Sequence, residues 1–243
     1  MLRRPICILP AAALLLALFM PSASASSSTV QPTALLPTGG FSIVQPDDKY
    51  AGKTYGQWSA SWWQWAAAIS KPNSPVDDPN GANCAVNQQG PVWFIAGNTT
   101  GGTTRRTCTV PDGKGILVPI INGECSTVEG NGTTEQELRA CAKGQIDAVT
   151  VTEATIDGRA VNLGRPNVGR FRFVSPLFQI SFAPNNAFGV NAGTGKSVAD
   201  GFWVLVKPLK TGNHTIDFHG RAVFPGSPPF DIDLHYKLKV TGE

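Results

Sequence analysis

The chain has 243 residues and a formal net charge of +3, with 20 Lys and Arg against 17 Asp and Glu. Arg3 and Arg4 lie in a segment that we expect to be removed, so the remaining charges almost balance. This balance argues against a dedicated nucleic-acid or anionic-membrane binder, because both need clustered Lys and Arg.

The first 25 residues have the pattern of a secretory signal peptide. Arg3 and Arg4 precede an apolar run over residues 6–19, and Ala23-Ser24-Ala25 supplies the small-x-small motif that signal peptidase accepts. The apolar run is too short for a membrane span and is soon followed by Ser and Pro. We therefore expect a signal peptide over 1–25, a secreted or periplasmic protein, and no transmembrane segment after cleavage.

Four cysteines follow the signal segment: Cys84, Cys108, Cys125 and Cys141. An even number in an exported chain predicts two disulfides, for which three pairings exist. We favour the bonds between sequence neighbours, Cys84–Cys108 and Cys125–Cys141, each contributing about 3 kcal/mol in the chain-entropy model. The alternative, a zinc site, lacks a C-x-x-C pair or an adjacent His.

The ordered part of the chain is expected to begin with a helix. Residues 26–48 are rich in Ser, Thr, Pro and Gly and predict a flexible lead-in to a single β-rich domain over 49–243. A helix is predicted over residues 55–69, where apolar side chains recur at helical spacing. The residues of this stripe are Tyr55, Trp58, Trp62, Trp65 and Ile69.

Strand patterns follow this helix. Residues 90–97 and 106–110 read as two strands around a Gly/Thr loop, and the continuous apolar run 115–121 predicts a buried strand. A second helix is expected to begin at Thr134, because Thr134 and Glu137 have the spacing of a capping box.

From Val149 onward the pattern alternates with period two. The Asp157-Gly158 pair predicts a tight hairpin turn. The alternation over 230–240 is typical of an antiparallel strand with one buried and one solvent-exposed face. Gly193–Ser197 resembles the end of a P-loop without its context and is expected to be a flexible loop. Other strands are expected over 170–174, 177–182, 202–206 and 214–218. The sequence thus predicts a mainly β fold, an antiparallel β-sandwich or jelly roll with two α-helices.

The Trp-rich helix allows two interpretations. Its regular spacing favours aromatic rings packed in a core, where each ring buries about 150–250 Å². The alternative is a stacking platform for sugar rings or another flat ligand. Trp63 lies off the stripe, and we predict Trp63 and Trp93 as the ligand-stacking residues.

Glu124 and His214 are the predicted catalytic residues. Glu124 follows a strongly apolar strand, and a carboxylate at a strand end can act as an acid or a base. Alternation places His214 on an apolar face, where a His more often has a structural, hydrogen-bonded role. No sequence pattern places the two side chains together.

A metal site is a further hypothesis. Asp217 and His219 share one strand face, as do Asp233 and His235. If the two strands pair, these groups could hold a divalent metal. We favour a solvent-facing strand, which shows the same alternation, and the sequence identifies no cofactor.

Two motifs resemble a group of uncharacterised exported proteins from bacteria and archaea. They are YGQWSASWWQW, which begins at Tyr55, and GPVWFIAG, which begins at Gly90; the segments 118–126 and 212–216 fit the same group. The resemblance covers residues 50–240. It implies export and a single domain, and it transfers no activity, cofactor or catalytic residue.

Together these observations predict a secreted or periplasmic, disulfide-stabilised protein that binds carbohydrate or cell-envelope material. The alternatives are an extracellular hydrolase that uses Glu124 and His214, with or without a metal, and a structural surface protein.

Overall fold

The computed structural model describes residues 40–164 and 169–242. The predicted signal peptide over 1–25 and most of the predicted lead-in lie outside these residues. Phe41 and Ile43 pack against the core, and the Val44 amide donates to the Leu205 carbonyl at 2.8 Å. The end of the predicted lead-in is therefore attached to the fold.

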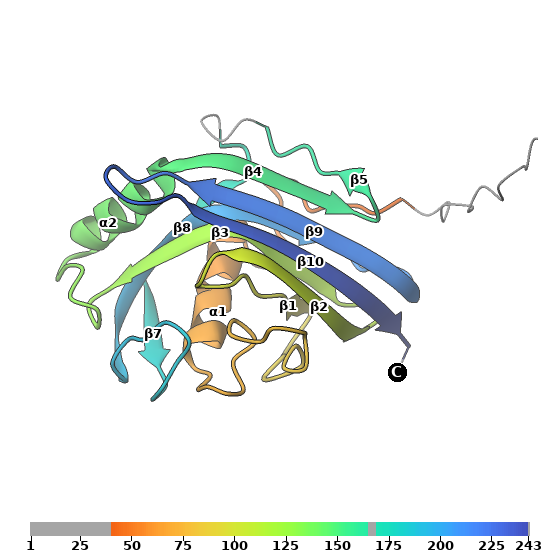
Figure 1. Ribbon diagram of the computed structural model, residues 1–243, viewed down its shortest axis with the longest axis horizontal. Helices are drawn as coiled ribbons and strands as arrows, with labels where there is room; N and C mark the ends of the chain where they lie inside the picture. Colours follow the sequence, from red (N-terminus) through yellow and green to blue (C-terminus); the bar gives the residue numbers. More distant parts are fainter. Residues whose placement is uncertain (1–39, 165–168, 243) are drawn as a thin grey trace, which may run out of the picture. The chain divides into compact units, whose positions relative to one another are not determined.

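Two helices form where the sequence predicts them, α1 (Tyr55–Ala67) and α2 (Glu135–Asp147) (Figure 1). Each begins with a capping box, Thr54 with Gln57 and Thr134 with Glu137. In a capping box the two side chains satisfy amide groups that have no partner within the helix. The α1 helix ends two residues before the predicted Ile69.

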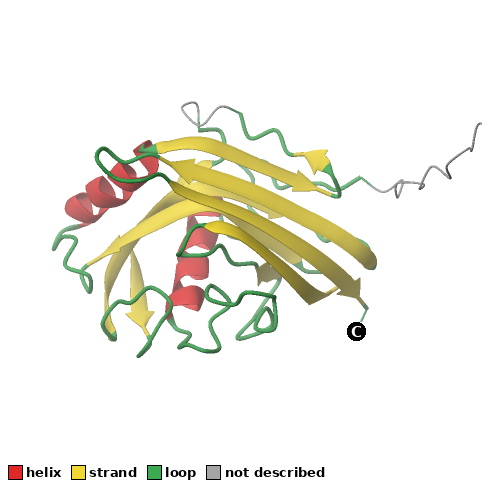
Figure 2. Cartoon of the chain, in the orientation of Figure 1, coloured by secondary structure: helices red, strands yellow, loops and turns green. Residues whose placement is uncertain are grey.

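Strands make up two five-stranded sheets in a sandwich-like arrangement, so the predicted fold class is confirmed (Figure 2). The first sheet has the order β1-β3-β8-β6, with β7 also paired to β8. Its strands are β1 (Val92–Phe94), β3 (Gly115–Ser126), β6 (Arg172–Val174), β7 (Phe178–Phe182) and β8 (Gly193–Val206). The second sheet has the order β2-β10-β9-β4-β5. Its strands are β2 (Gly102–Pro111), β4 (Val149–Ile156), β5 (Arg159–Ala160), β9 (Gly212–Ala222) and β10 (Phe230–Thr241).

Both sheets are mixed, because each contains one parallel pair. The β1 strand runs parallel to β3, and β2 runs parallel to β10. The two strands expected on either side of the Gly/Thr loop therefore lie in different sheets. A local sequence pattern predicts a strand but does not identify a partner that lies far along the chain.

The β3 strand of the first sheet packs against β9 and β4 of the second sheet. Nearly all of its residues are buried, as the predicted apolar run requires. Its pairing with β8 shifts register between Pro119 and Ile121, and such an irregularity accommodates a proline in a central strand. Gly220 of β9 lies against this point: a Cβ there would be 2.6 Å from the Cβ of Ile121.

The prediction of a flexible loop at residues 193–197 is wrong. This segment forms the start of β8 and pairs with β7 and, at Ser197, with β3. Gly195 permits the contact, since a Cβ at this position would collide with the side chains of Thr127 and Val128. The glycines thus allow close approach of the loop that follows β3.

The predicted hairpin is confirmed between β4 and β5. Asp157 and Gly158 have φ values of 50° and 71°, the positive angles of a primed two-residue turn.

Both predicted disulfides form, Cys84–Cys108 and Cys125–Cys141. The first joins the segment after α1 to β2, and the second joins β3 to α2. The α1 helix packs against β6, β7 and β8, whereas α2 packs against β3 and β8. No helix in the described residues is long and apolar enough to cross a membrane.

Candidate functional site

Glu124 and Trp63 line the same cavity, which has a volume of about 300 Å³. The sequence predicts a catalytic role for Glu124 and a ligand-stacking role for Trp63. The cavity is bounded by α1, the segment 97–99, the second half of β3, α2 and the start of β10. Its lining includes aromatic, amide and carboxyl side chains together with Val76, Pro119, Ile121 and Ile232. The aromatic residues are Trp62, Trp63, Phe188 and Phe230, the amides are Asn98, Asn122 and Gln145, and the carboxyl groups are Glu124 and Glu129.

Glu124 is the buried acid of the cavity, with only 6% of its surface exposed. The Ser197 hydroxyl donates to Glu124 Oε2. Burial is the main cause that raises the pKa of Glu124 to about 9, and the neighbouring Glu129 carboxyl adds to it; the bond from Ser197 acts in the opposite direction. Glu124 therefore carries a proton at neutral pH.

Glu129 lies on the loop between β3 and α2 and is exposed. The Ser126 hydroxyl donates to Glu129 Oε2 at 2.8 Å. The loop is closed by Asn131, whose backbone N–H donates to the Ser126 carbonyl at 3.1 Å. The cavity therefore holds one buried and one exposed carboxyl group.

Trp63 belongs to both the core and the cavity wall. It is 7% exposed, and its ring centroid lies 5.0 Å from that of Phe188. Its indole N–H is buried and has no hydrogen-bond partner in the described residues. A buried donor without a partner is unfavourable, so a ligand acceptor at this position would be stabilised.

The remaining tryptophans of α1 are anchored in the core, in line with the core interpretation of the helix, although Trp62 also lines the cavity. Trp58, Trp62 and Trp65 are buried and donate to the backbone carbonyls of Tyr50, Ile95 and Val86, at 3.0, 2.8 and 2.9 Å. Trp93, a predicted ligand-stacking residue, is buried in β1 and does not line the cavity.

The structure does not bring His214 to Glu124. His214 lies on β9, where Nδ1 is 2.8 Å from Asp157 Oδ2 and Nε2 is 2.8 Å from the Lys210 carbonyl. Nδ1 is thus engaged at the β4–β5 turn and Nε2 at the segment between β8 and β9, and His214 does not line the Glu124 cavity. The predicted catalytic pair is therefore not assembled.

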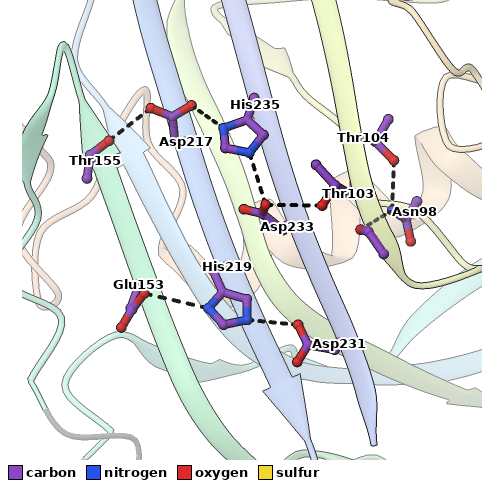
Figure 3. Close-up of polar contacts among 11 residues, drawn as sticks. Asn98, Thr103, Thr104, Glu153, Thr155, Asp217, His219, Asp231, Asp233 and His235 are labelled. Carbon is purple, nitrogen blue, oxygen red and sulfur yellow. Dashed lines mark hydrogen bonds and ion pairs between the residues drawn. The ribbon is translucent and has the colours of Figure 1, made fainter.

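The predicted metal ligands form polar pairs on the second sheet instead (Figure 3). His235 is 2.8 Å from Asp217 and 3.0 Å from Asp233, and His219 is 2.8 Å from Asp231. No group of three or more His, Cys, Asp or Glu side chains in the part of the chain that the structure describes is arranged to hold a metal ion. The His235–Asp217 and His219–Asp231 contacts are cross-strand pairs between β9 and β10, whereas His235 and Asp233 lie two residues apart on β10.

Sequence reasoning missed Glu129 and Gln145. The Gln145 amide donates to the Glu124 carbonyl at 3.4 Å and lies 3.3 Å from Cys125 Sγ. One signal could have found Gln145. It lies one helical turn after Cys141, on the same helix face, and the predicted Cys125–Cys141 bond places that face beside Glu124. No sequence pattern indicated Glu129, because its position depends on the fold of its loop.

A larger open groove of about 670 Å³ lies beside α1, lined by Trp58, Trp65 and Lys53 among others. The Lys53 ammonium sits 4.6 Å from the ring centroid of Trp58 and covers it. Both indole N–H groups donate to backbone carbonyls, and none of the described residues that line the groove carries a carboxyl group. The Glu124 cavity is therefore the stronger candidate site.

The described residues define a β-rich protein with two disulfides and a cavity of aromatic, amide and carboxyl groups. No family model and no curated protein matches the chain. Two solved structures show a weak likeness. One is the cysteine protease inhibitor EhICP2 from Entamoeba histolytica, with 12% identity over 56% of this chain and 86% of that one, and a TM-score of 0.21. The other is amebosin, with 13% identity over 56% and 96%, and a TM-score of 0.17. At these TM-scores neither likeness informs fold or function.

Proposed function

We propose that this chain is an exported binding protein for carbohydrate or cell-envelope material, and that the Glu124 cavity is its binding site. Aromatic faces pack against the apolar faces of sugar rings, while amide and carboxyl groups bind hydroxyls. The observation that carries the proposal is the convergence of Trp63, Glu124 and three amide side chains on one cavity. Two disulfides support export, because such bonds persist in oxidising compartments.

A glycan array followed by titration calorimetry tests this proposal. We expect wild-type protein to retain a defined set of glycans. Gln145→Ala should weaken that binding about tenfold, because one ligand hydrogen bond is lost. The matched control is Gln179→Ala, an exposed glutamine of β7 that is absent from the cavity wall.

Retention that is unchanged in Gln145→Ala would contradict the cavity as the binding site. Complete failure to retain glycans would contradict the carbohydrate proposal and leave the structural surface protein as the better explanation.

The hydrolase alternative needs a different partner for Glu124. Glu129 lines the same cavity, and the raised pKa of Glu124 leaves a proton available for general acid catalysis. Progressive cleavage of a retained glycan by wild-type protein, abolished in Glu124→Gln, would favour this alternative over simple binding.

A further inference from the structure

The charges of the Glu124 cavity narrow the chemistry of its ligand. Glu124 and Glu129 both line the cavity, and no Lys, Arg or His side chain does so in the described residues. Within the part of the chain that the structure describes, neither glutamate forms an ion pair. A buried carboxyl group normally has a cationic partner or remains neutral.

The basic residues of the neighbouring helix α2 are already paired elsewhere. Arg139 binds Glu135 at 2.5 Å and the Ser175 carbonyl at 3.0 Å, and Lys143 binds Asp147 at 2.5 Å. Helix α2 therefore supplies no cation to the two glutamates, whereas a ligand could supply one.

The cavity wall also suits a cation. Trp62, Trp63, Phe188 and Phe230 line it, and aromatic faces attract ammonium groups through their quadrupoles. Trp63 is more than nine-tenths buried, and its indole N–H has no hydrogen-bond partner among the described residues. An acceptor such as a sugar oxygen would supply that partner. At about 300 Å³ the cavity lies at the small end of ligand sites, which fits a single sugar unit.

We propose that the ligand of this cavity is an amino sugar with a free, protonated amine, held between the Glu124 and Glu129 carboxyl groups with its ring against Trp63. This inference rests on the proposed carbohydrate-binding function and specifies its substrate class. The amine forms charge-assisted hydrogen bonds, which are roughly twice as strong as neutral ones. An N-acetylated sugar lacks that charge and should bind more weakly.

A matched pair of ligands tests the inference directly. Chito-oligosaccharides are titrated into the full chain, with its disulfides oxidised, in their N-acetylated and de-N-acetylated forms at about pH 6, where the amine is protonated. We expect the de-N-acetylated form to bind at least about tenfold more tightly. Glu129→Gln should remove this preference, because it removes the exposed negative charge at the cavity.

The control is Glu153→Gln, which makes the same charge change at an exposed position of β4 outside the cavity. It should retain the wild-type preference. Equal binding of both oligosaccharide forms, or an unchanged preference in Glu129→Gln, would overturn the amine inference while leaving carbohydrate binding in place. Binding of neither form, nor of any neutral glycan on the array, would overturn the inference and the proposed function together.

Discussion

Glu124 is held in surroundings that favour its protonated form. The side chain is almost fully buried, and the Glu129 carboxyl discourages a second negative charge. Ser197 stabilises the ionised form by donating a hydrogen bond, but this effect is smaller than that of burial. The residue therefore gives the cavity a proton donor at neutral pH rather than a second charge.

This environment makes stability depend on pH. The pKa of Glu124 rises from 4.5 to about 9 on folding. Between these values the unfolded chain has lost the proton and the folded chain keeps it, so the free energy of unfolding falls as pH rises. The limit is about 1.4 kcal/mol per pH unit.

We expect Glu124→Gln to flatten this slope, because glutamine does not titrate. Urea denaturation at about pH 5, 7 and 9 measures the effect. Glu153→Gln, an exposed control, should keep the wild-type slope. Parallel pH curves for wild-type protein and Glu124→Gln would contradict the assignment of a buried proton to Glu124.

At the scale of elements, two glycines with equal free space should respond in opposite ways to the same substitution. A Cβ on Gly144 of α2 or on Gly158 of the β4–β5 turn meets no atom within 4 Å. Gly158 has a φ of 71°, which side chains disfavour, whereas Gly144 lies in regular helix.

Gly144→Ala should therefore raise the free energy of unfolding by about 1 kcal/mol. Gly158→Ala should lower it by about 1 kcal/mol or more. Thermal and urea unfolding of both variants would check this, and shifts of the same sign would show that backbone conformation does not govern these sites.

Elements that depend on local chemistry could be predicted from the sequence. The Thr134 capping box and the Asp157-Gly158 turn form between residues a few positions apart, and both are present. Strand partners could not be predicted in this way, because β1 and β2 pair with distant strands in different sheets.

The candidate site was predictable only in part, for the same reason. Glu124 was indicated by its place after an apolar strand and Trp63 by its position off the helical stripe. Their shared cavity depends on packing between α1 and β3 and on the loop that carries Glu129. His214 lies near the start of β9, where Asp157 and the Lys210 carbonyl bind its two ring nitrogens, the structural role that the sequence favoured over a catalytic one.

At the scale of the whole molecule, the two disulfides have similar loop lengths but different neighbours. Cys84–Cys108 spans 24 residues and Cys125–Cys141 spans 16. Cys84 and Cys108 lie near Arg106, whose guanidinium joins backbone carbonyls of Val76, Asp78 and Ala96. Cys125 instead lies next to Glu124 in sequence and contacts the Gln145 amide.

Replacing either pair with serine should lower the free energy of unfolding by about 3 kcal/mol, because both loops restrict the unfolded chain to a similar degree. Ligand binding should separate the two variants. Removal of Cys125–Cys141 breaks the covalent link between α2 and β3 beside the cavity. Because α2 is then held less firmly, glycan binding should weaken about tenfold, a cost of roughly 1.4 kcal/mol. Removal of Cys84–Cys108 should leave affinity near the wild-type value, when titrated at a temperature where both variants remain folded. Equal affinities in the two variants would mean that the position of α2 does not control the cavity.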